Sequence, residues 1–253
     1  LPTGGGNLIT TTGATFTGNV LHGDNVKSTF GAGNDLEIFH DGSNSRIKDL
    51  GTGVLVISGS ELHFNNAAST ENMIKAVEDG AVTLYHNHVA KLATTATGVV
   101  VTGGIALGGT GAANTLDDYE EGTWTPVYSG SSTAGSFSYN YQIGRYTKVG
   151  NLVTVVCSLV DISQSSAASG SVHITGLPFS SSNITALNSV GAVNLSRFNL
   201  DGQGQIVSIE GNTSYAQFVL MASGSGTGNL LDAGDRTGNS ADIFFTLTYR
   251  TDS

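Results

Sequence analysis

Two histidines separated by one residue are the sharpest candidates for chemistry in this sequence. His86 and His88 follow Val82 and Leu84 at intervals of two, so strand alternation would place all four side chains on one face. Imidazole nitrogens bind first-row transition metals such as iron or nickel, and about six of them would surround an axis shared by three parallel copies. The pattern predicts a metal ion on such an axis. The alternative is that both histidines lie in a turn near solvent.

Carboxylates offer a second kind of chemistry. Cleavage of a polysaccharide needs two carboxylates held about 5 to 9.5 Å apart in a sugar-sized cleft. Asp117, Asp118, Glu120 and Glu121 are instead clustered in one short stretch, which is typical of a solvated run. His173 has no recognisable Ser and Asp partners, and the sequence contains no G-x-S-x-G motif. We therefore expect no catalytic residues and no enzymatic activity.

Polar loops in the C-terminal half are the candidates for binding. Loops bear few packing demands, and three polar segments lie outside the expected strands, at 163–169, 199–205 and 223–239. The side chains there that can hydrogen-bond sugar hydroxyls are Asp201, Gln203, Asn229, Asp235 and Arg236. We expect these five residues to contribute to a receptor-binding site.

Composition limits the partners. The chain of 253 residues has 35 Gly, 3 Pro and 39% hydrophobic residues, enough apolar material for a folded, turn-rich β protein. Its net charge of -10 would repel nucleic acid and anionic membranes, which both need clustered Lys or Arg. No apolar run reaches the roughly 18 residues that span a bilayer, so we expect no membrane insertion. Because the chain begins at Leu1, we also expect an N-terminal part to precede it.

Residues 20–92 predict very short strands between frequent turns. The clearest strands are 36–39, 54–57, 62–64 and 82–85. Only 69–77 and 115–121 are candidates for helices. Such short strands give one chain a thin apolar stripe, too little to offset a backbone ordering cost of about 1–2 kcal/mol per residue. We therefore predict an elongated β shaft in which three parallel copies share their stripes as a homotrimer.

Beyond residue 122 the expected strands lengthen and most of them alternate. They are 136–141, 145–149, 152–160, 172–175, 190–195, 205–210, 215–221 and 242–251. This number fits a single jelly-roll-like β-sandwich, in which Cys157 is a buried strand thiol. We expect a shaft at 1–113, an acidic hinge at 114–122 and a receptor-binding domain at 123–253, all of them β structure.

Four segments resemble tail-fibre proteins of tailed phages. The run NTLDDYEEGTWTP at 114–126 is similar to the hinge before their C-terminal domain, and GRYTKVGN at 144–151 to the strand that follows it. DLEIFHDGSNSRI at 35–47 and KLATTATG at 91–98 resemble shaft modules of fibre and virion structural proteins in marine phages, notably those of cyanobacteria. The resemblance covers most of 24–151, and it implies a trimeric virion component assembled in the host cytoplasm. The His-x-His pattern likewise resembles iron sites of some phage fibres and spikes.

The expected function is adsorption to a host cell. The distal part of a tail fibre would bind a surface glycan such as lipopolysaccharide, or an outer-membrane receptor, and would join other tail proteins through the preceding N-terminal part. A trimer raises avidity because neighbouring weak sites act at high effective concentration. The alternatives are a purely structural virion fibre or decoration, and a polysaccharide depolymerase tailspike.

Overall fold

The computed structural model describes residues 17–109, 111, 114–184, 188–221 and 228–252. The chain divides into two compact units, Leu1–Val89 and Ala90–Ser253. The expected all-β fold is confirmed, since the described residues contain no α-helix and η2 (Ala233–Asp235) is a single 3₁₀ turn. None of the described segments forms a helix long and apolar enough to cross a membrane.

Both helical candidates are wrong. Residues 72–77 form strand β5 and residues 119–124 form strand β11. Ser69, the first residue of the expected helix at 69–77, has a φ of 55° and closes a turn in which its amide donates to the carbonyl of Asn66. The Asn66 side chain also accepts hydrogen bonds from the amides of Thr70 and Glu71. These local bonds satisfy the backbone in a hairpin connection, so no helix begins there.

The first sheet contains β1 (Ser28–Phe30), β2 (Leu36–His40) and β3 (Ser45–Asp49), all antiparallel and in chain order. Directly opposite residues share a face, so the register sorts the side chains. One face carries the apolar side chains Phe30, Leu36, Ile38 and Ile47. The other face carries Thr29, Glu37, Phe39, Arg46 and Lys48. The sheet is therefore amphipathic.

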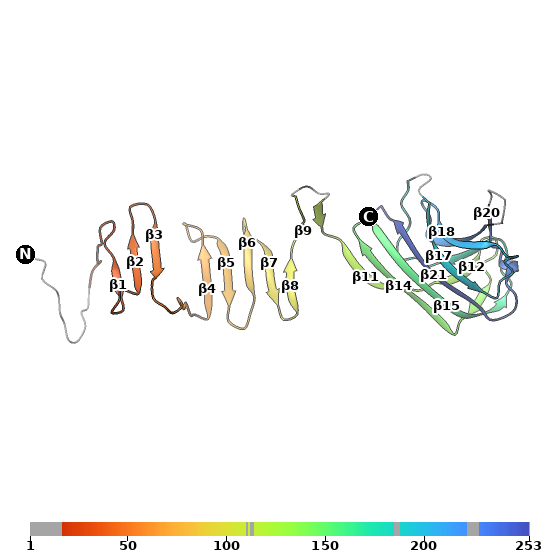
Figure 1. Cartoon of the computed structure of the whole chain (residues 1–253), viewed down its shortest axis with the longest axis horizontal. Coiled ribbons are helices and arrows are strands. Elements are labelled where there is room, and N and C mark those ends of the chain that lie inside the picture. The colour runs from red at the N-terminus through yellow and green to blue at the C-terminus, as the bar shows by residue number, and fades with distance from the viewer. Residues whose placement is uncertain (1–16, 110, 112–113, 185–187, 222–227, 253) are drawn as a thin grey trace, which may run out of the picture. The chain divides into compact units, whose positions relative to one another are not determined.

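The second sheet is an antiparallel meander of five strands in chain order (Figure 1). Its strands are β4 (Glu61–Asn65), β5 (Asn72–Val77), β6 (Val82–His86), β7 (Val89–Thr95) and β8 (Gly98–Val101). Positive φ angles at both Asn87 and His88 form the two-residue turn that links β6 to β7, as in type I′ hairpins. Three of the four predicted shaft strands are confirmed as β2, β4 and β6. The strand expected at 54–57 is wrong: these four apolar residues, three of them β-branched, lie outside the strands of the described chain.

Strands β4, β5 and β6 also separate apolar from polar side chains. Their register aligns Leu62 with Ala76 and Val82, and Phe64 with Ile74 and Leu84, on one face. The opposite face carries Glu61, His63, Lys75, Thr83 and Tyr85, with Val77 as an apolar member opposite Glu61. We call the first of these the apolar ladder.

The C-terminal sheet has eleven strands and follows a short hairpin of β9 (Ile105–Ala106) and β10 (Thr115–Leu116). Its path is β11-β14-β15-β21-β17-β18-β19-β16-β12, with β13 paired to β15 and β20 to β19. The strands are β11 (Tyr119–Trp124), β12 (Val127–Gly130), β13 (Ser136–Ser138), β14 (Tyr141–Val149), β15 (Leu152–Ser166), β16 (Val172–Thr175), β17 (Ser189–Ser196), β18 (Gly204–Ile209), β19 (Tyr215–Met221), β20 (Gly228–Leu230) and β21 (Ala241–Arg250).

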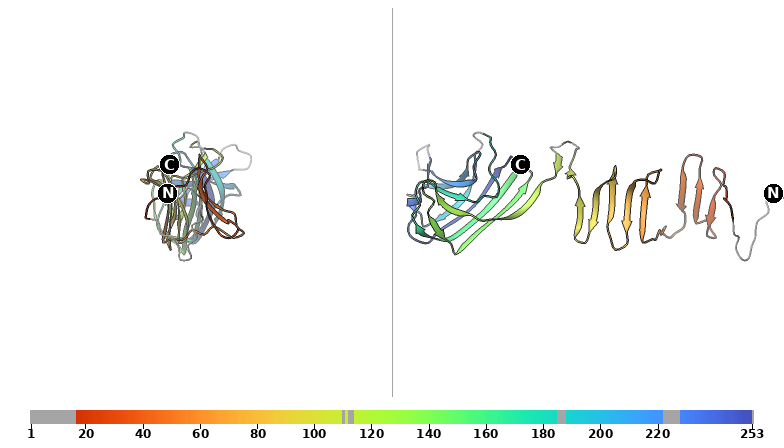
Figure 2. Two further views of the ribbon diagram at one scale, coloured as in Figure 1. Left: turned by 90° about the vertical axis from the view of Figure 1, so that its left-hand side faces the viewer. Right: turned by 180° about the vertical axis from the view of Figure 1, so that it is seen from behind.

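This sheet curls until its two halves face each other across one hydrophobic core, as Figure 1 and the rear view in Figure 2 show. β17 makes the curl, because residues 189–191 pair with β18 whereas residues 192–196 pair with β21. The largest fully buried side chains include Tyr128, Phe218 and Tyr249. Cys157 is 1% exposed in β15, which confirms the buried strand thiol, and burial raises the pKa of that thiol.

Most predicted C-terminal strands are confirmed. The ranges 172–175 and 215–221 coincide with β16 and β19. The expected hinge at 114–122 overlaps β10 and β11, and β11 is hydrogen-bonded to β14 along its whole length. The domain boundaries at 113 and 122 and the jelly-roll-like assignment stay predictions.

Candidate functional site

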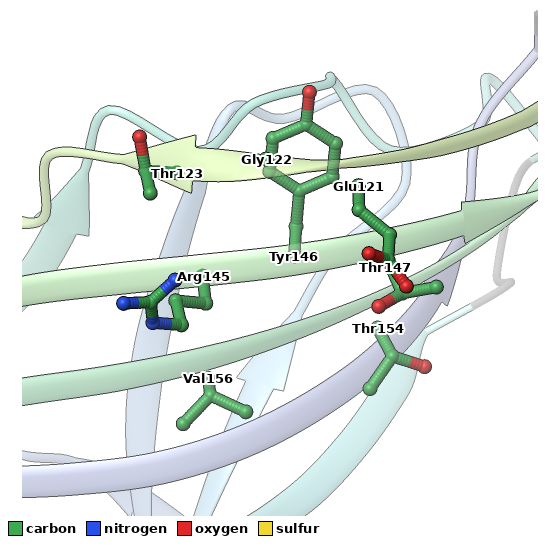
Figure 3. Close-up of a pocket in the computed structure, with 8 residues that line it drawn as sticks. All are labelled: Glu121, Gly122, Thr123, Arg145, Tyr146, Thr147, Thr154 and Val156. Atoms are coloured by element: carbon green, nitrogen blue, oxygen red, sulfur yellow. The ribbon is translucent and has the colours of Figure 1, made fainter. Parts of the chain in front are cut away.

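A hollow of about 450 Å³ lies on β11, β14 and β15 of the C-terminal sheet (Figure 3). The register explains how three strands build it, because Glu121 lies opposite Thr147, which lies opposite Thr154. In the next row, Thr123 lies opposite Arg145, which lies opposite Val156. Gly122 and Tyr146 complete the lining. Buried Val155 points to the core between exposed neighbours, so these two rows form the outer face.

The chemistry of the outer face changes from row to row along the strands. The row before Glu121 is apolar, because Tyr119 lies opposite Val149 and Val149 opposite Leu152. The row of Glu121 holds a carboxylate and two hydroxyls, and the row of Thr123 holds a guanidinium, a hydroxyl and an isopropyl group. Such a strip offers an aromatic ring, hydrogen-bond donors and acceptors within the width of three strands, about 10 Å.

The hollow has two charged side chains, Glu121 and Arg145, and only Glu121 has a hydrogen-bond partner within the described chain. Glu121 accepts a hydrogen bond from the Tyr119 hydroxyl, and this bond raises the pKa of that tyrosine. Glu121 and Arg145 do not form an ion pair with each other, since no bridge within 4.0 Å joins them. Across the described part of the chain, the Arg145 guanidinium has no hydrogen-bond or ion-pair partner. Its donors are therefore free for a ligand.

Gly122 and Tyr146 fix the shape of this hollow. A Cβ at position 122 would lie 2.6 Å from the Tyr146 ring, so only glycine lets the ring pack across β11. The Tyr146 hydroxyl donates to Glu120, and the ring meets Phe179 edge to face at 5.5 Å between centroids. Beside it, Lys148 forms an ion pair with Asp118, and its side chain is only 4% exposed. β11 is thus anchored to β14 from the inner side, which leaves the outer side open.

The acidic run is exposed to solvent, as expected, but two of its carboxylates also bond to the next strand. Glu120 is exposed and the Asp118 side chain is 39% exposed, and they bond to β14 through Tyr146 and Lys148. The reason is that the run continues as a strand whose alternate side chains point to opposite faces. The inward carboxylates fasten the edge strand, and the outward Glu121 lines the hollow.

Three of the five predicted binding residues gather at one end of β18, β19 and β20. Gly204 lies opposite Met221, which lies opposite Gly228, and Leu220 lies opposite Asn229. Gln203 precedes β18, and its amide donates to the carbonyl of Leu200 across a turn in which Asp201 has a φ of 46°. The structure therefore brings Asp201, Gln203 and Asn229 to the same end of the sheet.

Asp235 and Arg236 bond within the domain. The Asp235 carboxylate accepts the amide of Asp232 at 2.9 Å as one half of a capping box. Arg236 donates to the carbonyl of Ile162 at 2.8 Å and to the Gln164 side chain, and it lies 5.7 Å from the ring centre of Phe137. Arg236 holds the segment before β21 against β15 and β13, and Asp235 closes the 3₁₀ turn within that segment. Whether any of the five contacts a receptor stays a prediction.

The two histidines do not lie on one strand. β6 ends at His86, and His88 occupies the hairpin turn with a φ of 64°. His88 Nε2 lies 2.8 Å from Glu71 Oε1. The alternation that linked them to Val82 and Leu84 therefore stops at His86, because the turn changes the side-chain direction. Within one chain, the described residues contain no group of three or more potential metal ligands.

Sequence reasoning missed the hollow. Six of its eight lining residues lie in the two segments 114–126 and 144–151 that resemble tail-fibre proteins, and Thr154 and Val156 lie on the strand that follows. The expected hinge at 114–122 contains most of strand β11, in which Tyr119, Glu121 and Thr123 point to the same face. The pattern of Arg145, Thr147 and Val149 on the next strand was the available signal, but pairing of the two strands was needed to combine them.

Comparisons with known proteins give one match. No protein-family model matches the chain, and neither does any curated protein. Among solved structures, the chain is similar to the Dettilon tailspike protein (gp208), with a TM-score of 0.43 and 18% sequence identity. This match covers 55% of this chain and 25% of that one, so it spans a quarter of the tailspike.

Replacing Arg236 tests its role in the fold. We expect Arg236→Met to lower the free energy of unfolding by about 1–3 kcal/mol, because the buried carbonyl of Ile162 loses its donor. Urea unfolding followed by the fluorescence of the single tryptophan, the core residue Trp124, measures this change. Asn229→Ala, at an exposed position, should stay within about 0.5 kcal/mol of the parent chain. Equal stability of both variants would contradict the structural role.

Metal analysis of the purified protein tests the predicted metal site. A site on an axis shared by three chains predicts one iron or similar ion per three chains, lost in both His86→Ala and His88→Ala. His40→Ala, an exposed histidine of the first sheet, is the control and should leave metal content unchanged. A protein free of stoichiometric metal contradicts the site.

Proposed function

We propose that this chain is the distal segment of a homotrimeric phage tail fibre that binds the surface of the host cell. The observation that supports it most is the uncovered apolar ladder of β4 to β6, which one chain cannot bury. The C-terminal domain, as a knob, would carry the receptor-binding surface, and the fibre would join other tail proteins in the virion.

The apolar ladder is exposed in the single chain. Phe64 is 52% exposed and Leu84 is 39% exposed, and Ile74 and Val82 are exposed as well. The opposite face is already satisfied by its own polar groups. Glu61 lies 2.8 Å from His63 and 3.2 Å from Lys75, and these bonds lower the pKa of Glu61. One face is therefore suited to water and the other to a protein partner.

The first sheet repeats this division. Phe30 is 52% exposed and Ile47 is 61% exposed on its apolar face. On the polar face, Lys27 pairs with Glu37 at 2.8 Å and lies 5.0 Å from the ring centre of Phe39. Because two consecutive sheets both expose an apolar face, one kind of partner that buries both faces is the simplest explanation.

A second copy of the chain is the occupant that fits both sheets. Like chains in parallel present the same apolar side chains at the same height, so each stripe meets its equivalents. Burial contributes about 25 cal/mol per Å² of apolar surface removed from water, so each added copy that buries such surface stabilises the assembly. Three copies close around an axis and leave each polar face outward. The resemblance to trimeric fibres favours three over two.

The mass of the particle in solution tests the assembly. Sedimentation at micromolar concentration should give three times the mass of one chain. Leu84→Asp places a charge in the apolar ladder and should shift the particle toward the monomer. Thr83→Asp, on the adjacent residue of the same strand but on the polar face, is the matched control and should stay trimeric. A folded monomer of the unaltered chain would contradict the proposal.

Adsorption tests the binding role. Virions whose fibre lacks residues 123–253 should bind host cells much less than unaltered virions, since the C-terminal domain carries the loops and the outer face. Assembly of the shortened fibre into virions is the control. Unchanged adsorption would instead support a purely structural fibre or decoration.

The depolymerase alternative is distinguished by its product. A tailspike that cleaves polysaccharide would release reducing sugar from host envelope material, and a binding fibre would not. Release of reducing sugar by the unaltered chain would support the depolymerase.

A further inference from the structure

The hollow on β11, β14 and β15 combines groups that recognise sugars. Glu121 can accept hydrogen bonds from sugar hydroxyls, whereas Arg145 can donate to sugar oxygens. The hydroxyls of Thr123 and Thr147 can do both, and that of Thr154, which shares a hydrogen bond of 3.0 Å with the Thr248 hydroxyl, can still accept. Its size of about 450 Å³ lies within the range of sites for small ligands. These properties, which rest on residues outside the loops of the predicted binding site, identify a second surface for host contact.

The neighbouring row supplies an apolar platform. Tyr119 is 60% exposed on the same face, one row from Glu121, and Val149 and Leu152 continue the row across β14 and β15. An aromatic ring beside hydrogen-bonding groups suits a pyranose, which has apolar C–H faces and polar edges. The bond from the Tyr119 hydroxyl to Glu121 holds the ring and the carboxylate together.

Charge decides which sugar class fits. The hollow contains one carboxylate, Glu121, and one guanidinium, Arg145, so its formal charge is balanced. The chain as a whole carries a net charge of -10, which opposes the approach of an anionic polymer. A neutral sugar meets neither a local excess of charge nor this long-range repulsion.

We propose that this hollow is a binding subsite for a neutral hexose unit of a host surface polysaccharide. The pyranose ring of the hexose packs on Tyr119. Glu121 accepts hydrogen bonds from two neighbouring sugar hydroxyls, and Arg145 donates to the oxygen on the next carbon of the sugar. This subsite rests on the proposed host-binding function and names its ligand class. It also assigns a role to the unpartnered Arg145, which the fold itself does not use.

The full-length chain provides the test. The protein is applied to an array of neutral and acidic hexose oligosaccharides, and the Kd of each bound glycan is measured by titration. Arg145→Gln and Glu121→Gln should each weaken binding of neutral glycans by about tenfold or more, because each removes a charged hydrogen-bonding partner. Arg197→Gln is the charge-matched control, since it removes the same charge from an exposed side chain next to β17 that lines neither the hollow nor the apolar row. Urea unfolding confirms that each variant is folded.

Four outcomes overturn the subsite. Unchanged affinity in both hollow variants places the glycan elsewhere and leaves the host-binding function intact. Exclusive binding of acidic glycans refutes the neutral class. A lower assembly mass in Arg145→Gln identifies the hollow as an interface between copies. Absence of glycan binding refutes the subsite, and the adsorption experiment then decides the host-binding function independently.

Discussion

An antiparallel sheet pairs its backbone groups within its own plane, so stability depends on what covers its two faces. This constraint separates the two parts of the chain. In the sheets of β1 to β3 and β4 to β6, the described chain supplies no second layer, and Phe30, Ile47, Phe64 and Leu84 remain exposed. In the C-terminal sheet, β17 pairs with both halves and bends them around one core. One part covers its own apolar face, and in the other the apolar faces stay uncovered within one chain.

The same constraint assigns the functional surfaces. In the C-terminal sheet, the inward side chains of β15 and β21 are fixed by packing, as Val155, Leu247 and Tyr249 are fully or almost fully buried. The outward positions carry no such demand, so they can hold a carboxylate, hydroxyls and a free guanidinium. Gly122 affects both faces of the sheet. Because it has no Cβ, the Tyr146 ring can pack across β11 and anchor this strand from the inner side. Strand-borne side chains are also held more rigidly than loops, which suits recognition.

Much of the fold was predictable, and the exceptions have physical reasons. Residues 172–175 and 215–221 alternate strongly and became β16 and β19. The apolar run 54–57 did not become a strand, because strand propensity without a paired neighbour leaves the backbone groups without partners. The helix expected at 69–77 was prevented by the side-chain bonds of Asn66. His86 and His88 were separated by a turn whose two residues both adopt positive φ, which alternation does not reveal.

The sequence by itself determined the β class, the excess of turns, the acidic charge and most strand positions, because these depend on local patterns of period two and on turn-forming residues. Only the tertiary structure decided which strands are neighbours. Pairing joined Glu121 of β11 to Thr147 and Thr154, and it turned Asp118 and Glu120 into anchors of an edge strand. Those relationships depend on register between residues distant in the chain, and a one-residue slip would exchange the faces.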